Sequence, residues 1–354
     1  MMEVLLIFIV LIYSHQVYRF YKGWHNLDPF ESDFSPKVSV VIALRNEEEN
    51  IPFLLEDLSK QDYSSDCLEF ILVDDFSDDN SYDLLKQSSL PLKVLRSKEE
   101  GKKAAINSGV AVAQYDIILT TDADCRLSSN WVKQMLAPFS DDSIHLVSGP
   151  VSYTNLNTVF DKFQAIEFMS LIGSGAGAIG VNKAFMCNGA NMAFRKSIFA
   201  DTKEHIASGD DVFLLHHVKK TGSKIAFVKE QSAIVFTSPK ASLKAFFNQR
   251  KRWAAKSSSY TDASAQWIST VVFLINLVLI LLLFTAKFNL FLLVFFIKLI
   301  VDYLFVKSLS RFFFYEKYLS YYWFMAFFYP FYIVWVAVGS QFSSFEWKER
   351  KHQR

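Results

Sequence analysis

Residues 38–44 read VSVVIAL, an aliphatic run that is rich in β-branched side chains. A nearly continuous apolar run of this kind is typical of a strand buried on both faces of a parallel sheet. The same kind of pattern predicts further strands at 68–73, 92–95 and 117–121, and helices over 47–60, 79–87 and 102–113. Strands that alternate with helices predict an α/β domain with a mostly parallel sheet.

Polar side chains follow three of these strands at the point where each strand ends. They are Arg45, Asn46, Glu47 and Glu48, then Asp74, Asp75, Ser77, Asp78 and Asp79, and finally Asp122 and Asp124. Each cluster alone is explained by helix capping or a solvated loop. Because parallel sheets bind ligands at the carboxyl ends of their strands, the joint placement favours one binding site at a single sheet edge.

The sequence Asp122-Ala123-Asp124 predicts a metal site at that edge. Two carboxylates on either side of a small residue can approach one divalent cation, and oxygen ligands suit Mg²⁺ or Mn²⁺. Such a cation would bridge a diphosphate. The chain has neither a GxxxxGK[ST] loop nor a GxGxxG fingerprint, so the metal and basic side chains would hold a nucleotide. Lys102 and Lys103, at the start of a predicted helix, are candidates.

Two later motifs carry further candidate groups. Ser208-Gly209-Asp210-Asp211 opens a predicted helix, either as a helix cap or as a general base that takes a proton from an acceptor hydroxyl. In Gln249-Arg250-Lys251-Arg252-Trp253, an arginine can hold a leaving diphosphate through two hydrogen bonds. The tryptophan can stack on a sugar face.

Long apolar runs predict membrane helices. They are residues 267–285, 288–306 and 321–340, together with a shorter N-terminal anchor at 4–18. The first run is long enough to cross a bilayer core of about 30 Å. Lys298 and Asp302 are four residues apart in the second run, so they share a helix face, either as a structural ion pair or as the lining of an acceptor path.

The charges that flank these runs give conflicting signals about orientation. Arg19 and Lys22 follow the N-terminal anchor and favour a cytoplasmic catalytic domain, and the basic tail at 346–354 also favours the cytoplasm. Three spans after a cytoplasmic domain would place that tail outside. Either one apolar segment is re-entrant or interfacial, or the tail breaks the rule.

Residues 242–260 predict a basic amphipathic helix in the membrane interface, with charge supplied by Lys244, Arg250, Lys251, Arg252 and Lys256. We therefore expect five parts. They are an N-terminal anchor at 1–22, a catalytic domain at 36–240, the interface helix at 241–262, two or three transmembrane helices at 263–345 and the basic tail at 346–354.

Composition excludes several classes of protein. The net charge of +1 argues against a nucleic-acid binder, and 51% hydrophobic residues argue against intrinsic disorder. The three cysteines Cys67, Cys125 and Cys187 form no CxxC pair, so a zinc site or a disulfide framework is not expected. A membrane protein with one large α/β domain remains.

Taken in order, these motifs resemble the family 2 glycosyltransferases of the GT-A fold, over roughly residues 36–260. The chain looks most like the membrane-embedded group that includes hyaluronan, cellulose and poly-N-acetylglucosamine synthases and ceramide glucosyltransferase. The resemblance implies nucleotide contacts from Ala43, Arg45, Glu47, Asp75, Lys102, Lys103 and Asp122, and a metal at Asp124 with Asp122. It implies acceptor contacts from Gly189, Asn191, Gln249 and Trp253, and catalysis by Asp211, in one motif with Asp210, and by Arg252.

The resemblance also implies an activity. We expect an inverting transferase that moves a hexose or N-acetylhexosamine from a UDP-sugar to a lipid or growing glycan, with Mg²⁺ or Mn²⁺. The alternatives are transfer to a polyprenyl phosphate and a non-catalytic scaffold of a glycan assembly complex. We expect a protein of a bacterial inner membrane that contacts membrane lipids but no nucleic acid. Its few spans would enclose a channel only if the chain pairs with itself or with a partner subunit.

Overall fold

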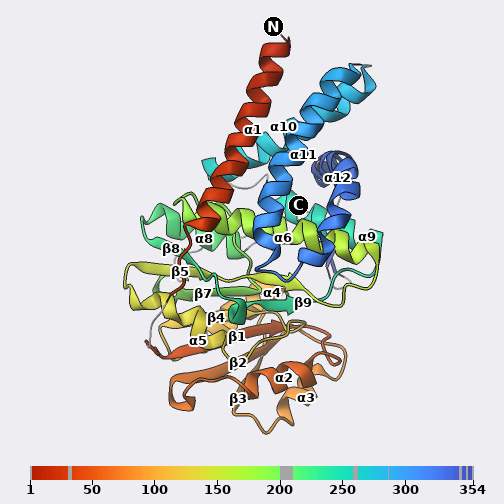
Figure 1. Ribbon diagram of the computed structural model, residues 1–354. Helices are drawn as coiled ribbons and strands as arrows, with labels where there is room; N and C mark the ends of the chain where they lie inside the picture. The colour runs from red at the N-terminus through yellow and green to blue at the C-terminus, as the bar shows by residue number, and fades with distance from the viewer. Residues whose placement is uncertain are drawn as a thin grey trace. The chain divides into compact units, whose positions relative to one another are not determined.

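The chain forms two units. A computed structural model describes residues 2–30, 34–199, 210–257, 262–285, 287–342, 345–347 and 350–352 (Figure 1). Residues 27–154 and 186–238 form the sheet unit, and residues 1–26, 155–185 and 239–354 form the helical unit. The helical unit thus takes residues 155–185 from within the range 36–240 that the sequence favours as one domain.

The described part of the sheet unit is built on a seven-stranded sheet in the order β3-β2-β1-β4-β7-β5-β8. Its strands are β1 (Val38–Leu44), β2 (Leu68–Asp74), β3 (Leu92–Arg96), β4 (Ile117–Thr121), β5 (Ile144–Ser148), β7 (Asn191–Arg195) and β8 (Lys224–Phe227). Strands β1 to β4 run parallel, whereas β7 runs antiparallel to both β4 and β5. The predicted α/β class and mostly parallel sheet are confirmed.

Helices and a small second sheet surround this core. The helices are α2 (Ile51–Ser59), α3 (Ser81–Lys86), α4 (Lys102–Val112), α5 (Trp131–Leu136), α7 (Lys196–Phe199) and α8 (Asp210–Lys220), and β6 (Val151–Tyr153) pairs with β9 (Val235–Thr237). Helix α2 begins later than the predicted residue 47. The N–H of Glu47 donates to Ser81 Oγ and that of Glu48 to Asp79 Oδ2, so these two residues form a turn instead.

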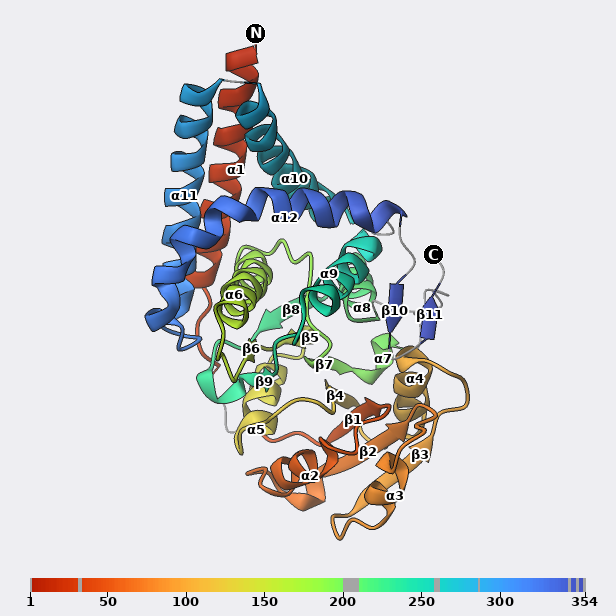
Figure 2. The ribbon, with the colours of Figure 1, turned by 90° about the vertical axis from the view of Figure 1, so that its right-hand side faces the viewer.

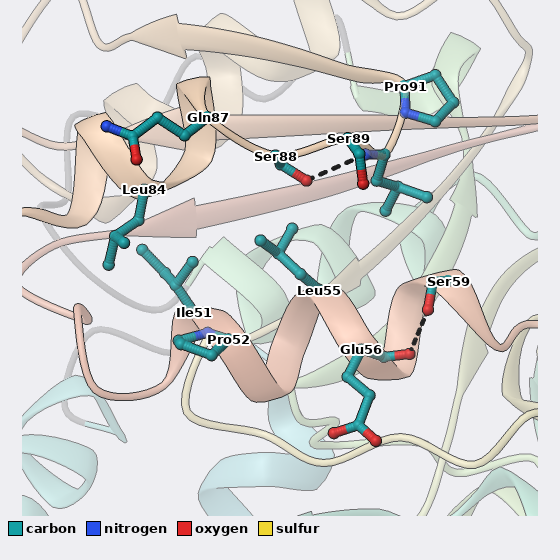
Figure 3. Close-up of a pocket in the computed structure, with 11 residues that line it drawn as sticks. Ile51, Pro52, Leu55, Glu56, Ser59, Leu84, Gln87, Ser88, Ser89 and Pro91 are labelled. Carbon is teal, nitrogen blue, oxygen red and sulfur yellow. Dashed lines mark hydrogen bonds between the residues drawn. The ribbon is translucent and has the colours of Figure 1, made fainter.

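A shallow hollow lies between α2 and the segment that joins α3 to β3 (Figure 3). The aliphatic side chains of Ile51, Leu55 and Leu84 face one another across it. Its described lining includes none of the side chains that the sequence favours for nucleotide, metal or acceptor binding. The side chains predicted to form the active site lie elsewhere in the chain.

The helical unit contains four helices long and apolar enough to cross a membrane, among the residues described. They are α1 (Met2–His25), α10 (Ala263–Phe284), α11 (Phe288–Ser310) and α12 (Tyr322–Phe342), the last preceded by a short 3₁₀ helix. Two further helices are α6 (Val159–Gly180) and α9 (Leu243–Ser257). The four apolar segments predicted from the sequence are confirmed as helices.

Helices α1 and α6 touch backbone to backbone at glycines. A Cβ atom at Gly23 would lie 1.8 Å from the carbonyl oxygen of Gly177, and one at Gly180 would lie 2.1 Å from that of Gly23. Without side chains at these positions the two helix backbones can approach closely, which is how small residues stabilise helix pairs in membranes. The glycine-rich end of α6 is thus closely packed against α1.

The predicted ion pair inside α11 is confirmed. Lys298 Nζ donates to Asp302 Oδ2 at 2.6 Å, and the hydroxyl of Tyr13 on α1 donates to Asp302 Oδ1 at 2.7 Å. Charged groups within a membrane segment are stabilised when they pair with each other and with polar side chains. The contact with α1 favours the structural interpretation of this pair over the acceptor path.

Helix α12 runs across the other apolar helices instead of alongside them. Figure 2 shows it lying across the direction of α1, α10 and α11, and the view in Figure 1 looks nearly along it. Tyr332 and Val336 pack with Phe246 of α9. The opposite face exposes a stripe of large rings: Trp323, Phe324, Phe327, Phe328 and Trp335. Such a helix suits the plane of a membrane interface, where aromatic rings are enriched.

Candidate active site

The topology of the sheet gathers the predicted site residues at one edge. Strands β1 to β4 are parallel, so their carboxyl ends share that edge. Because β7 is antiparallel to β4, with Thr121 opposite Asn191, the residues that precede β7 lie at the same edge. The Asp122–Asp124 loop and the Gly189 loop therefore become neighbours, although they are far apart in the sequence.

Lys102 forms an ion pair with Asp122. Burial acts to lower the pKa of Lys102, but the charges of Asp122, Asp211 and Asp124 outweigh it and raise the pKa above its usual value. All three carboxylates are thus close enough to act on one ammonium group. The candidate active site contains a half-exposed lysine among three carboxylates drawn from two distant parts of the chain.

Asp124 is exposed, while its neighbour Cys125 is buried beneath it. The thiol of Cys125 lies 3.7 Å from Asp124 Oδ1. Burial raises the pKa of Cys125, and the charges of Asp124 and Asp122 raise it further, so the thiol stays protonated and can donate. The loop therefore presents the carboxylate of Asp124 outward on a buried support.

These residues fit a divalent cation that is shared with a ligand. In the described part of the chain no group of three or more His, Cys, Asp or Glu side chains could enclose a metal. The exposed Asp124 and the adjacent Asp122 can supply two oxygen ligands. Mg²⁺ usually keeps several waters and is bound by one or two carboxylates together with substrate phosphates, so a two-carboxylate loop is adequate.

Asp75 is buried at the end of β2, with 1% of its surface exposed. Its Oδ1 accepts a 2.7 Å hydrogen bond from the N–H of Gly101, the residue before α4. Burial raises the pKa of Asp75 above its usual value, although this hydrogen bond and the charge of Arg45 act in the opposite direction. A buried acid with a raised pKa at a ligand-binding sheet edge is typical of functional sites.

The turn after β1 is joined to the turn after β2 by an ion pair and hydrogen bonds. Arg45 is buried and pairs with Asp78 at 3.1 Å, and the side-chain oxygen of Asn46 accepts from the N–H of Asp78 at 2.9 Å. Glu47 Oε2 accepts from the amide of Asn50 at 2.6 Å. Ala43 is a buried position of β1 itself. Arg45 and Glu47 hold the shape of this turn, and their predicted nucleotide contacts stay predictions.

Asp211 lies in the first turn of α8 and is tied to the Gly189 loop. Its Oδ2 accepts a 2.9 Å hydrogen bond from the N–H of Gly189. The carbonyl of Gly189 is in turn 3.1 Å from Thr120 Oγ1 on β4, two residues before Asp122. A short path of hydrogen bonds thus connects the predicted general base to the predicted metal loop.

Asn191 is fully buried, and its side-chain amide forms hydrogen bonds within the sheet unit. Its Oδ1 accepts from Trp131 Nε1 at 2.9 Å, and its Nδ2 donates to the carbonyls of Pro150 at 2.8 Å and Ala233 at 2.9 Å. Contact with an acceptor would break one of these bonds. The geometry gives Asn191 a part in holding the start of β7 and the Gly189 loop.

The structure describes little or nothing of some other predicted residues. Ser208 and Gly209 lie outside the described residues, as does the side chain of Asp210. Lys103 is half-buried in the first turn of α4, beside Lys102. Lys103 thus lies at the start of the helix where the sequence places it, and the roles of all these residues stay predictions.

Gln249, Arg252 and Trp253 lie on α9 in the helical unit. Arg250, one of the residues expected to supply positive charge to this helix, is buried, with only 3% of its surface exposed. Its guanidinium donates to both oxygens of Glu167 on α6, at 2.5 and 3.2 Å, and to Gln249 Oε1 at 2.6 Å. The ring of Trp253 lies 4.3 Å from it.

Sequence reasoning missed the partner of Arg250. Glu167 is buried in α6, where Tyr332 of α12 donates to its Oε1 at 2.9 Å. The acid and the arginine are far apart in the chain, so no local pattern joins them. The available signal was an acid within an apolar helical stretch, because a buried charge needs a partner.

Comparison with known proteins identifies the class first. The chain is similar in fold to a mannosyltransferase, PcManGT from Pyrobaculum calidifontis, solved in complex with GDP-Man and Mn²⁺. The TM-score is 0.62 at 16% identity, and the match covers 97% of this chain and 99% of that one. The sheet unit therefore has the GT-A glycosyltransferase fold.

The sequence is similar to that of sugar transferases. Residues 39–202 match the family model Glycosyl transferase family 2. Glycosyltransferase AglE of Haloferax volcanii is 26% identical over 204 residues, which cover 55% of this chain and 65% of that one. A poly-beta-1,6-N-acetyl-D-glucosamine synthase of Staphylococcus aureus is 26% identical over 241 residues, 65% of this chain and 55% of that one. The chain thus spans between half and two thirds of these relatives.

Proposed function

We propose that the protein transfers a hexose or N-acetylhexosamine from a UDP-sugar to the hydroxyl of a lipid or growing glycan at the cytoplasmic membrane face. The observation that carries the proposal is the cluster of Asp122, Asp124 and Asp211 around Lys102 at the carboxyl edge of the sheet. A diphosphate, a metal and an acceptor hydroxyl need these groups together. Residues 39–202 also match a family of sugar transferases.

The proposed reaction is a single displacement. The acceptor oxygen bonds to the anomeric carbon while the bond from that carbon to the diphosphate oxygen breaks, so the anomeric configuration inverts. Asp211 takes the proton of the acceptor hydroxyl, and the diphosphate leaves with the bonding electrons. The hydrogen bond from the N–H of Gly189 holds Oδ2 of Asp211 in place. A positioned carboxylate can act as a general base.

The remaining residues bind and orient the donor. Asp75 is proposed to contact the nucleoside, and Lys102 to approach the diphosphate when it separates from Asp122. A divalent cation at Asp122 and Asp124 would supply positive charge to the departing nucleotide. Arg252 and Trp253 are proposed to assist the leaving group and to stack on the sugar or acceptor. The similarity to a poly-beta-1,6-N-acetyl-D-glucosamine synthase supports an N-acetylhexosamine as one donor to test.

The membrane topology is a proposal that follows from α12. With α1, α10 and α11 as spans and α12 in the plane of the interface, the sheet unit and the basic tail fall on one side. Both charge signals, Arg19 with Lys22 and residues 346–354, then favour the cytoplasm. The test replaces Phe328 or Lys348 by cysteine, one at a time, and labels sealed vesicles with an impermeant maleimide. Labelling reports the side of the membrane on which each position lies. Opposite sidedness for Lys348 and the sheet unit would contradict it.

The activity is tested with the detergent-purified chain. Release of UDP or GDP is measured from UDP-glucose, UDP-N-acetylglucosamine and GDP-mannose, with Mn²⁺, Mg²⁺ or chelator, and with extracted membrane lipids. Products are sized by mass spectrometry. A single-sugar lipid selects a lipid glycosyltransferase, and a ladder selects a processive synthase. Full activity in the presence of chelator would contradict the proposed mechanism. A product that keeps the donor's anomeric configuration would also contradict it.

A further inference from the structure

The helical unit has a hollow where α1, the end of α6 and the start of α10 meet. Its volume is about 240 Å³, enough for a phosphate group and the carbons attached to it. Gln16 and Arg19 of α1 line one side, Lys183 lines another, and Ser264 and Trp267 of α10 complete it. Among the described lining residues none is acidic. The hollow therefore combines two positive charges with neutral polar groups.

The side chains of Gln16, Arg19 and Lys183 make no hydrogen bond or ion pair with any other described residue. Gln16 is buried, with 6% of its surface exposed, whereas Arg19 is half-buried and Lys183 is exposed. Two cations without a counter-charge, beside a buried amide and a hollow whose described lining has no acidic side chain, favour an anion that accepts hydrogen bonds. An anion with several oxygens can satisfy all three.

The local fold fixes this arrangement. The glycine contact between α1 and α6 brings the last turns of both helices together, next to Arg19. Helix α6 ends at Gly180, and Asn182, two residues later, adopts a left-handed conformation with φ of 55°. The N–H of Lys183 donates back to the carbonyl of Ala178 at 2.8 Å, as in other helix endings of this type. The chain turns back at this point and places Lys183 at the hollow.

The position of the hollow along the helices points to a lipid headgroup. Arg19 precedes the end of α1 by less than two turns, and Trp267 lies in the second turn of α10. Cations and tryptophan at the ends of membrane helices sit at the level of lipid headgroups. Trp267 is half-exposed and can lie beside the acyl chains.

We propose that this hollow is a specific site for the phosphate headgroup of a membrane lipid, held by Arg19, Lys183 and Gln16. The guanidinium of Arg19 can donate bidentate hydrogen bonds to phosphate oxygens, and the ammonium of Lys183 adds a positive charge. The bound lipid would join α1 to α10 through its headgroup. Binding requires no sugar donor and no transfer, so the site is independent of the proposed catalytic function.

The test uses quenching of Trp267 fluorescence by lipids with brominated acyl chains, in mixed micelles of the full-length protein. Trp267→Phe provides the background from the other tryptophans. The brominated probes are phosphatidic acid and phosphatidylcholine. We expect phosphatidic acid to be preferred, and Arg19→Gln with Lys183→Gln to lower that preference by roughly tenfold or more. Unbrominated phosphatidic acid and polyprenyl phosphate then compete in separate arms, which distinguishes a phospholipid from a phosphorylated lipid carrier.

The matched control is Lys22→Gln with Lys307→Gln, two exposed lysines of the helical unit that do not line the hollow. It removes the same charge, so a general attraction to anionic lipid would fall equally in both double variants. An equal fall would overturn the proposal, as would a wild-type protein that does not prefer phosphatidic acid. An unchanged thermal unfolding midpoint in lipid-free detergent separates lost binding from lost folding.

Discussion

The backbone N–H of Gly189 donates a 2.9 Å hydrogen bond to Oδ2 of Asp211, and a Cβ atom at Gly189 would lie only 3.4 Å from the Cβ of Asp211. The loop before β7 and the first turn of α8 are therefore in direct contact. The contact fixes one oxygen of the proposed base. This relationship connects the antiparallel strand of the sheet to the chemistry of the site.

Replacement of Asp211 by Asn should remove the proposed base while it keeps the side-chain shape. We expect the turnover rate with a hydroxyl acceptor to fall by about two to four decades, with little change in donor affinity. Asp66→Asn, at an exposed carboxylate of the same unit, is the control. If Asp211→Asn keeps substantial activity, transfer to an already ionised polyprenyl phosphate becomes the better explanation.

Asp124→Asn should weaken the metal site, because the exposed oxygen ligand of the loop loses its charge. We expect the Mn²⁺ concentration needed for half-maximal activity to rise by about tenfold to a hundredfold. A titration of activity with Mn²⁺ at saturating donor measures this. An unchanged metal requirement in Asp124→Asn would assign the cation to other groups.

Asp75→Asn should weaken nucleotide binding but stabilise the fold at neutral pH. The pKa of Asp75 is raised by burial, so the folded state binds more protons than the unfolded state just above pH 4. The contribution of Asp75 to the free energy of unfolding therefore falls as the pH rises through that window. The difference in thermal midpoint between the variant and wild type should grow from pH 4 to pH 7. A constant difference would show that the ionisation of Asp75 does not matter for stability.

Glu167→Gln should destabilise the helical unit, because it leaves the buried guanidinium of Arg250 without its counter-charge. We expect a loss of about 3–5 kcal/mol in the free energy of unfolding. Lys244→Gln, at an exposed position of α9, is the control. The double variant Glu167→Met with Arg250→Met should recover part of the loss. A double variant no more stable than Glu167→Gln would mean that the pair has no special coupling.

Gly180→Leu should separate α1 from α6, since its Cβ atom would lie 2.1 Å from a backbone oxygen of Gly23. The expected result is a lower thermal midpoint and faster proteolysis near α1. Ser174→Ala, on the same helix, adds no atoms and should change neither. Wild-type behaviour of Gly180→Leu would contradict the close helix contact.

The sequence predicts the parts of the fold that depend on local patterns. Strands β1 to β4 are aliphatic runs, and the polar residues after them follow from the rule that parallel strands bind ligands at their carboxyl ends. Strand β7 is antiparallel to its neighbours, and the sequence of residues 191–195 does not predict this direction. The bond from Gly189 to Asp211 depends on that direction, so it could not be predicted.

The helical unit illustrates the same limit with charges. Arg250 reads as one of several basic residues on an amphipathic helix, and only the position of Glu167 on α6 explains why it is buried. The pair Lys298 and Asp302 was predictable because both residues lie on one helix, four positions apart. Partners within one helix can be read from spacing, whereas partners on different helices require the tertiary structure.

The glycine contact between α1 and α6 has a consequence for synthesis in the cell. Helix α1 leaves the ribosome before α6, and its backbone partners Gly177 and Gly180 emerge only after strands β1 to β6 have been made. Helix α1 must therefore wait in the bilayer with its glycine surface uncovered while most of the sheet is translated. A nascent chain that stalls within this interval would present an unpaired membrane helix, which is a substrate for quality-control proteases and for wrong helix partners.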